Sequence, residues 1–161
     1  MSLLKELLSD TLGGVLMWHS LNTQKDICDF LDIYGGFHDS CLKELHYVSG
    51  AYVNEDLSMY PVNDKRTLRV LFQSQGSSLP VVEIEFLKIY KLNLKPDSEK
   101  YTCLILDSSM FFEEGKLYWA DSEIFKEQRE LYDGTWICAE NARWRSLDGA
   151  LGKEIKFLKD V

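Results

Sequence analysis

Residues 35–41 (Gly-Gly-Phe-His-Asp-Ser-Cys) hold the side chains of this chain that are best suited to chemistry. An imidazole, a carboxylate and a thiol follow two glycines that free the backbone. This pattern admits catalysis with Cys41 as the nucleophile and His38 as its base, or metal ligation by His38 and Asp39. It also admits a structural interpretation, in which Asp39 and Ser40 bond backbone amides and His38 braces the connection.

The spacing of these residues favours the structural interpretation. In a strand, His38 and Cys41 point to opposite faces because they are three positions apart. The chain has no Cys-x-x-Cys pair, no glycine-rich phosphate loop and no G-x-S-x-G elbow. We therefore expect no metal and no cofactor, and we favour a binding protein over an enzyme. The alternative is a small-ligand-binding protein or a hydrolase-like enzyme with its site near His38 and Asp39.

Charge and aromatic side chains concentrate together in residues 107–133. This stretch has eight acids and three bases, so it carries -5 of the chain's net charge of -8. Aromatic anchors inside a charged rim are typical of protein-recognition surfaces, and acids steer a basic partner toward them. The predicted partner-binding residues are Glu113, Glu114, Trp119, Glu123 and Glu127. In the alternative interpretation the aromatics form core and the acids only solubilise the surface.

Composition limits the class of protein. The chain has 161 residues, of which 45% are hydrophobic, and this predicts one globular α+β domain over residues 1–161. A sequence pI near 4.9 argues against nucleic acid or an anionic membrane as the partner. Charged residues interrupt the apolar N-terminus, and four cysteines show no disulfide framework. We expect a reduced, cytoplasmic protein.

The first third of the chain carries helical patterns. Leucines at helical spacing predict a short amphipathic helix over 2–10, which could also pair with a second copy in a homodimer. A second helix is expected to begin after the cap Asn22-Thr23 and to end at Gly35. Glycines at 13–14 separate the two predicted helices.

From residue 36 onward the apolar pattern alternates, as in strands. We predict a mainly antiparallel sheet of six to seven strands, either strongly curled or two-layered. Glu83 and Glu85 are expected on the solvated face of one strand. The predicted strands cover 40–53 with an interruption at Gly50, 67–73, 101–106 as a central strand, a hairpin over 111–119, and 135–144. Residues 82–94 are predicted as one long strand or as two strands joined by a bulge near Lys88. A helix is predicted over 122–132.

Four short motifs resemble a loose group of small bacterial β-rich proteins. They are Phe-His-Asp-Ser at 37–40, Glu-Ile-Glu-Phe at 83–86, Ile-Leu-Asp-Ser-Ser at 105–109 and Ile-Cys-Ala-Glu at 137–140. Some members of that group are similar to immunity proteins, which neutralise bacterial toxins by direct binding. The resemblance implies a β-rich fold and a protein partner, and it transfers no catalytic residue.

Overall fold

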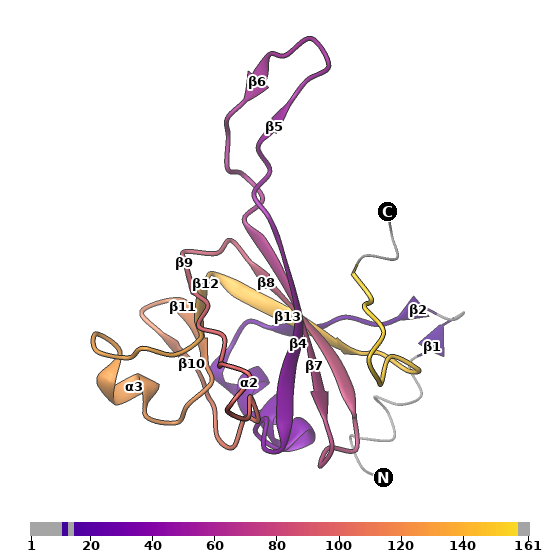
Figure 1. Ribbon diagram of the computed structural model, residues 1–161, viewed down its shortest axis with the longest axis vertical. Helices are drawn as coiled ribbons and strands as arrows, with labels where there is room; N and C mark the ends of the chain where they lie inside the picture. The colour runs from indigo at the N-terminus through magenta and orange to yellow at the C-terminus, as the bar shows by residue number, and fades with distance from the viewer. Residues whose placement is uncertain (1–10, 13–14, 158–161) are drawn as a thin grey trace.

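The computed structural model describes residues 11–12 and 15–157 and consists mainly of antiparallel sheet with two helices (Figure 1). Its strands form two larger sheets and two small hairpins. The expected β-rich α+β fold is thereby confirmed at the level of its antiparallel sheets, although the strands are more numerous and shorter than predicted. The predicted helix over 2–10 lies outside the described residues.

The first sheet has five strands in the order β3-β13-β8-β7-β4. Alternating apolar residues build it: Leu68, Val70 and Phe72 of one strand all point into the core. This confirms the strand predicted over 67–73. The bounds are β3 (His19–Leu21), β4 (Ser40–Val48), β7 (Thr67–Ser74), β8 (Val81–Leu87) and β13 (Asn141–Ser146).

The second sheet has four strands in the order β10-β11-β12-β9. The predicted hairpin is confirmed, and its loop residues Glu114 and Gly115 both have positive φ, as a two-residue turn between twisted strands requires. Trp119 points into the shared core, where its ring lies 5.1 Å from that of Phe72. The bounds are β9 (Lys91–Asn93), β10 (Ser109–Glu113), β11 (Lys116–Ala120) and β12 (Trp136–Ala139).

Two neighbouring segments, residues 81–93 and 136–146, each run from one sheet into the other. The strand expected over 82–94 divides at Lys88, whose φ of +55° bends it, so that β8 and β9 belong to different sheets. The strand expected over 135–144 divides in the same way at Glu140. Backbone bonds from Tyr90 to Cys138 (2.8 Å) and from Glu140 to Leu87 (3.1 Å) join the two bends. Paired bends of this kind form the corner between two packed sheets.

Helix α2 (Gln24–Tyr34) confirms the second predicted helix. Thr23 caps it in a reciprocal capping box with Asp26, and Gly35 ends it in the left-handed conformation. Its buried residues Ile27, Phe30 and Tyr34 pack into the core. The helix contacts β3 and β10, the edge strands of the two sheets, and so closes one side of the core.

Residues 94–108 close the opposite side, between edge strands β4 and β9. The prediction of a central strand over 101–106 is wrong: only Ile105 forms a bridge, to Ser40, while Tyr101, Leu104 and Leu106 are exposed. The apolar residues 101–106 resembled a strand that is covered on both faces, but in this segment only the Ile105 side chain is buried against the core.

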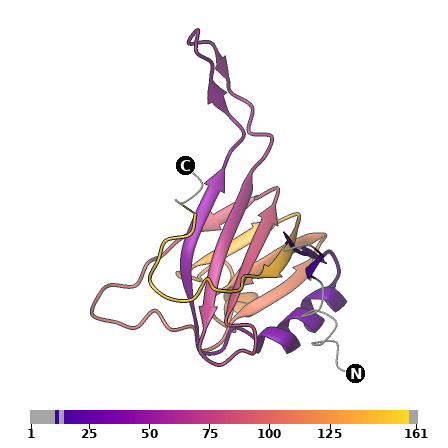
Figure 2. The same ribbon diagram turned by 90° about the vertical axis from the view of Figure 1, so that its right-hand side faces the viewer.

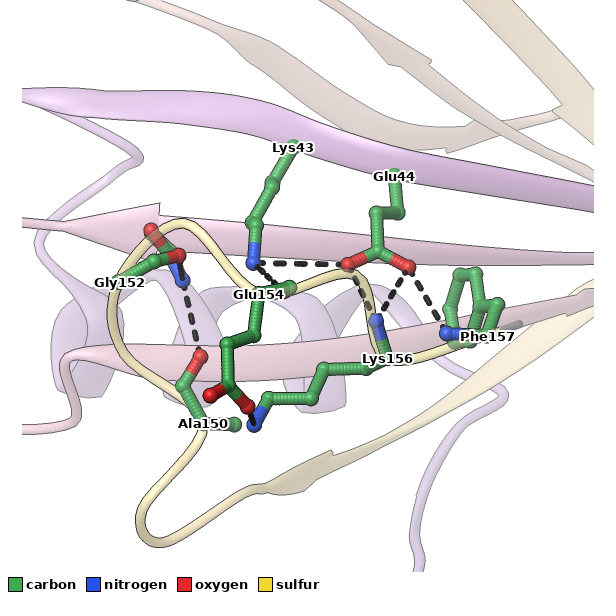
Figure 3. A network of polar contacts seen from close by, with 8 residues as sticks. Lys43, Glu44, Ala150, Gly152, Glu154, Lys156 and Phe157 are labelled. Carbon is green, nitrogen blue, oxygen red and sulfur yellow. Dashed lines mark hydrogen bonds and ion pairs between the residues drawn. The ribbon is translucent and has the colours of Figure 1, made fainter. Parts of the chain in front are cut away.

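A C-terminal strap, residues 147–157, crosses the outer face of the first sheet (Figure 3). The Glu44 carboxylate accepts hydrogen bonds from the amides of Lys156 (2.8 Å) and Phe157 (2.9 Å). The Gln73 amide donates to the carbonyls of Ala150 (2.9 Å) and Gly152 (3.1 Å). Side chains thus hold the strap where no ladder of backbone bonds does, and no helix or strand is formed between residues 149 and 157.

Two hairpins complete the described chain. One pairs β1 (Thr11–Leu12) with β2 (Val15–Leu16). The other pairs β5 (Tyr52–Val53) with β6 (Met59–Tyr60) and extends far from both sheets as an arm (Figures 1 and 2). The strand predicted over 40–53 therefore splits at Gly50 into the end of β4 and one side of this arm.

Candidate functional site

The turn at 35–39 joins α2 to β4 through an unusual backbone. Gly35, Gly36, Phe37 and Asp39 all have positive φ, between 56° and 75°. Only glycine adopts this region at low cost, so Phe37 and Asp39 need compensation from their surroundings. Phe37 receives it by full burial, with its ring 4.9 Å from Phe72.

His38 is exposed and holds the 104–108 segment. Its Nδ1 lies 2.5 Å from the Leu106 carbonyl oxygen, which can only accept, so Nδ1 donates. Its Nε2 is 3.9 Å from the Asp39 carboxylate. The Leu106 carbonyl first, and then Asp39 and Asp107, raise the pKa of His38 above its ordinary value of 6.5.

Two further bonds complete this grip. The Ile105 amide donates to the Ser40 carbonyl (2.8 Å), and the Ser108 hydroxyl donates to the Gly36 carbonyl (3.0 Å). The Ser40 hydroxyl turns back to the Phe37 carbonyl within the turn itself. His38, together with the carbonyls of Gly36 and Ser40, therefore holds residues 105–108, and this group of contacts is named the clamp. The Ser40 hydroxyl bonds a carbonyl and not the backbone amide that the structural interpretation predicted.

Asp39 and Cys41 line an open groove of about 510 Å³ beside Gln73 and Leu151, and His38 is not among the groove's residues. Burial, together with the nearby Cys103, raises the pKa of the Cys41 thiol above its ordinary 9.0. A raised pKa lowers the thiolate fraction and hence the nucleophilicity. The geometry does not bring Cys41 and His38 together as nucleophile and base. Among the described residues, no three His, Cys, Asp or Glu side chains cluster as metal ligands do.

The acidic and aromatic region divides into an interior and a rim. The predicted anchor Trp119 is fully buried between the sheets, so it cannot contact a partner directly. Strand alternation explains this, because Trp119 points inward while its neighbour Tyr118 points outward. The outward aromatics form a second cluster with Phe125 at its centre: Phe111, Tyr118, Tyr132 and Trp136.

Helix α3 (Phe125–Gln128) covers this aromatic cluster. A helix is predicted over 122–132, but only these four residues are helical. The N-cap of α3 is Ile124, and not Asp121 or Ser122 as expected. The Asp121 carboxylate is engaged elsewhere, since it accepts from the Thr135 amide (3.1 Å) and from Tyr132. The Ser122 hydroxyl accepts from the Ile124 amide (3.4 Å), ahead of the helix, and the Ser122 carbonyl accepts from the Ser109 hydroxyl. The segment is held to the sheet by these side-chain bonds instead of by helical propagation.

The predicted acids differ in their surroundings. Glu113 pairs with Arg129, whose guanidinium lies 4.2 Å from the centre of the Tyr118 ring. Glu114, Glu123 and Glu127 are exposed. Glu113 therefore belongs to the cover of the aromatic cluster, and the other three are available at the rim.

Sequence reasoning missed three residues of this surface. Leu131 is 88% exposed, Ile124 is 45% exposed, and Glu130 lies beside them on the rim. Glu130 and Leu131 line a groove of about 460 Å³, together with Glu127 and the bases Lys126 and Arg129. Ile124 and Leu131 fit the helical spacing that predicted a buried face, so the pattern indicated core where the structure has surface.

A cavity of about 220 Å³ lies beneath the 94–108 segment and reaches Trp119. Leu42, Leu94 and Ile105 give it apolar walls, and Asp121 adds a carboxylate. The Trp119 Nε1 is buried without a hydrogen-bond partner in the described part of the chain. A buried indole N–H without a partner is costly, and the residue that carries this donor lines the cavity.

The fold and these surfaces define a β-rich two-sheet protein with an acidic rim. No protein-family model, no curated protein and no solved structure matches this chain. In the described ranges, 11–12 and 15–157, no helix is both long enough and apolar enough to cross a membrane.

Proposed function

We propose that this chain is a protein-interaction module that binds a basic protein through its α3 surface. We define this surface by six exposed residues: Glu114, Glu123, Ile124, Glu127, Glu130 and Leu131. Exposed Lys126 lies on the same helix, with its ammonium 5.0 Å from the centre of the Phe111 ring. The observation that carries the proposal is Leu131, a large apolar side chain left 88% exposed among acids. Exposed apolar groups inside a charged rim are typical of recognition sites.

The charges of the surface suit a basic partner. No ion pair within the described residues neutralises Glu114, Glu123, Glu127 or Glu130, whereas the neighbouring Glu113 and Asp133 are paired with Arg129 and Lys95. Unpaired acids steer a basic protein and accelerate its association.

The aromatic cluster beneath makes the surface rigid. Phe125 is fully buried, and its ring lies 5.1 Å from Trp136 and 5.3 Å from Tyr132. A preorganised surface loses little conformational entropy on binding. The aromatics therefore act as a platform that presents Ile124 and Leu131, in place of the direct contacts expected of them.

An immunity-like role in the cytoplasm is the specific form of this proposal. Neutralising a basic toxin by direct binding requires an acidic surface that is shaped before the encounter, as the α3 surface is. All four cysteines carry free thiols, and those of Cys28 and Cys103 are exposed, which suits a reducing compartment.

The test is capture of proteins from the native host by two variants of equal charge. One variant reverses Glu114, Glu123, Glu127 and Glu130 to Lys; Glu113 is left intact because it pairs with Arg129. The control reverses four exposed acids elsewhere: Asp32, Glu99, Glu140 and Asp148. Both sets move the net charge from -8 to zero.

We expect the wild type and the control to capture the same basic protein, and the α3 variant to lose it. Loss with both variants would indicate bulk charge attraction, and capture by all three would refute the α3 surface. Circular dichroism of each variant establishes that it is folded.

The cavity next to Trp119 supports a second candidate function, the binding of a small molecule with a hydrogen-bond acceptor. The observation in its favour is the unpartnered Nε1 of Trp119. NMR screening of small carbonyl compounds against wild type and Trp119→Phe tests it. Hits that shift the Trp119 Nε1–H signal in the wild type and lose affinity for the variant would support this function; an unchanged signal would exclude it.

A further inference from the structure

The arm, residues 49–66, exposes more apolar surface than its own hairpin can cover. It projects away from both sheets in two perpendicular views (Figures 1 and 2). A two-stranded hairpin is marginal by itself, and exposed apolar patches mark interaction sites. Its exposed apolar side chains are Tyr52, Val53, Leu57, Met59, Tyr60 and Val62.

The base of the arm is held in a fixed direction. Gly50 has a φ of 103°, and a Cβ at this position would lie 2.1 Å from the Asp64 carboxylate, so glycine is required where the two sides of the arm approach. The amides of Lys65 and Arg66 both donate to the Ser49 carbonyl at 3.0 Å. From the bend that follows β8, the Lys88 ammonium donates to the Asp64 carbonyl (2.5 Å).

The tip of the arm is acidic. Glu55 and Asp56 lie there, and no Lys or Arg occurs between residues 51 and 64. Leu57 follows them, 83% exposed. The tip therefore offers two negative charges and one large apolar side chain.

The base groove, by contrast, is cationic and aromatic. It has a volume of about 380 Å³, and its residues come from the arm base and the nearby strands. The Tyr90 ring lies 5.7 Å from the Arg66 guanidinium and 5.1 Å from the Lys116 ammonium. The groove is lined by Tyr47, Asn63, Arg66, Ile89, Tyr90, Lys91 and Leu92.

We propose that two copies of this chain associate through their arms, with each acidic tip seated in the base groove of the other copy. Antiparallel arms make both contacts at once, since a two-fold axis pairs tip with groove and groove with tip. The Tyr52 and Tyr60 rings, stacked at 5.1 Å between tip and base, then lie close to the axis.

Charge and apolar surface both support a second copy as the occupant. The charges of tip and groove are complementary within one chain, so the same surface serves both copies. The cross-strand pair Tyr52 and Tyr60, 56% and 36% exposed, gives one face of the hairpin an aromatic surface for the contact. The arm lies apart from α3, so this dimer leaves the α3 surface free and does not depend on the proposed function (Figure 1).

Two opposite charge variants test the arm dimer in the full chain. The tip variant is Glu55→Lys/Asp56→Lys, and the groove variant is Lys91→Glu/Lys116→Glu. Each places like charges together in its own dimer, while an equimolar mixture restores two complementary contacts. Sedimentation velocity over a concentration series reports the oligomeric state.

We expect a wild-type dimer, a dissociation constant raised more than about tenfold in each variant alone, and a mixed dimer when the two are combined. A wild-type protein that is monomeric throughout the series would overturn the proposal, as would variants that dimerise like the wild type. A mixture that remains monomeric would contradict the tip-to-groove arrangement. Unchanged circular dichroism spectra establish that the variants fold.

Discussion

The outer faces of the two sheets are covered in opposite ways. On the first sheet, Glu83 is fully buried and bonds Arg69 and Arg145 (2.8 Å) from the neighbouring strands, beneath the C-terminal strap. On the second sheet, an aromatic cluster around Phe125 lies beneath the α3 segment. The first face combines an ion-pair network with the small apolar cluster of Leu71, Val81 and Ala150, whereas the second face is an aromatic core.

The two faces differ in whether their charged side chains are paired with one another or remain exposed to a partner. Acids and bases on the first face neutralise one another, so that face has little charge left to offer a partner. On the second face the aromatics bury themselves, and of the surrounding acids Glu113 pairs with Arg129. The rim acids Glu114, Glu123, Glu127 and Glu130 form no ion pair in the described part of the chain. Charged residues that look alike in the sequence therefore have different roles, according to what lies across the sheet from them.

Removing the centre of the aromatic face should have the largest effect on stability. We expect Phe125→Ala to lower the free energy of unfolding by about 3–5 kcal/mol, because it leaves a cavity among four aromatic rings. Urea denaturation measures this. The matched control Phe157→Ala removes a half-buried ring from the strap and should cost clearly less. Equal losses would mean that the two outer faces are not as different as described.

Breaking the ion-pair network around Glu83 should cause the second-largest loss of stability. Glu83→Ala leaves two guanidinium groups without their shared carboxylate, and we expect a loss of about 2–3 kcal/mol, reduced from the fully buried case because both arginines reach solvent. The triple variant Glu83→Leu/Arg69→Met/Arg145→Met removes the whole network and should recover most of that loss. A triple variant as unstable as the single one would show that the network itself stabilises the fold.

The strap should respond to acid through Glu44. Burial acts to raise the pKa of this carboxyl, but the amide bonds from Phe157 and Lys156 outweigh it and hold the pKa below its ordinary 4.5. A lowered pKa means that this contribution is present above 4.5 and is lost as the pH falls through the folded-state value.

We therefore expect Glu44→Gln to cost about 1–2 kcal/mol at neutral pH and nothing in strong acid. Chemical denaturation across the acid range measures the difference from the wild type, with exposed Glu140→Gln as the control. If the stability difference between the wild type and Glu44→Gln were the same at every pH, the ionisation of Glu44 would not stabilise the strap.

The smallest effect concerns the His38 clamp. A raised pKa means that its stabilising contribution is complete below 6.5 and is lost as the pH rises through the folded-state value. Hydrogen exchange of the Ile105 amide, corrected for intrinsic rates, should therefore accelerate as the pH rises above 6.5. His38→Gln should remove this pH dependence while the fold persists. A pH dependence that survives the substitution would assign it to another group.

Local signals predicted the elements that depend on nearby residues. The capping box at Thr23, the left-handed Gly35 and the tight turn at Gly115 are each specified within a few positions, and the structure forms all three. The alternation of residues 67–73 likewise fixed which side chains point into the core.

Features that depend on distant residues could not be predicted. Glu83 looked like a solvated residue, and its burial depends on Arg69 and Arg145, which lie 14 and 62 positions away. The sheet-to-sheet corner at Lys88 follows from pairing with residues near 140. In the candidate site, the exposed acids were foreseen, but the burial of Trp119 and the exposure of Leu131 required the tertiary structure.

The most direct test of the central claim is a titration of the captured basic protein, once purified, against three forms of this chain. Isothermal titration calorimetry would compare the wild type, the four-fold α3 reversal and the equally charged control reversal. We expect wild type and control to bind alike, and the α3 variant to bind at least about 100-fold more weakly with an unchanged melting temperature. Equal affinity of all three forms would contradict the assignment of binding to the α3 surface.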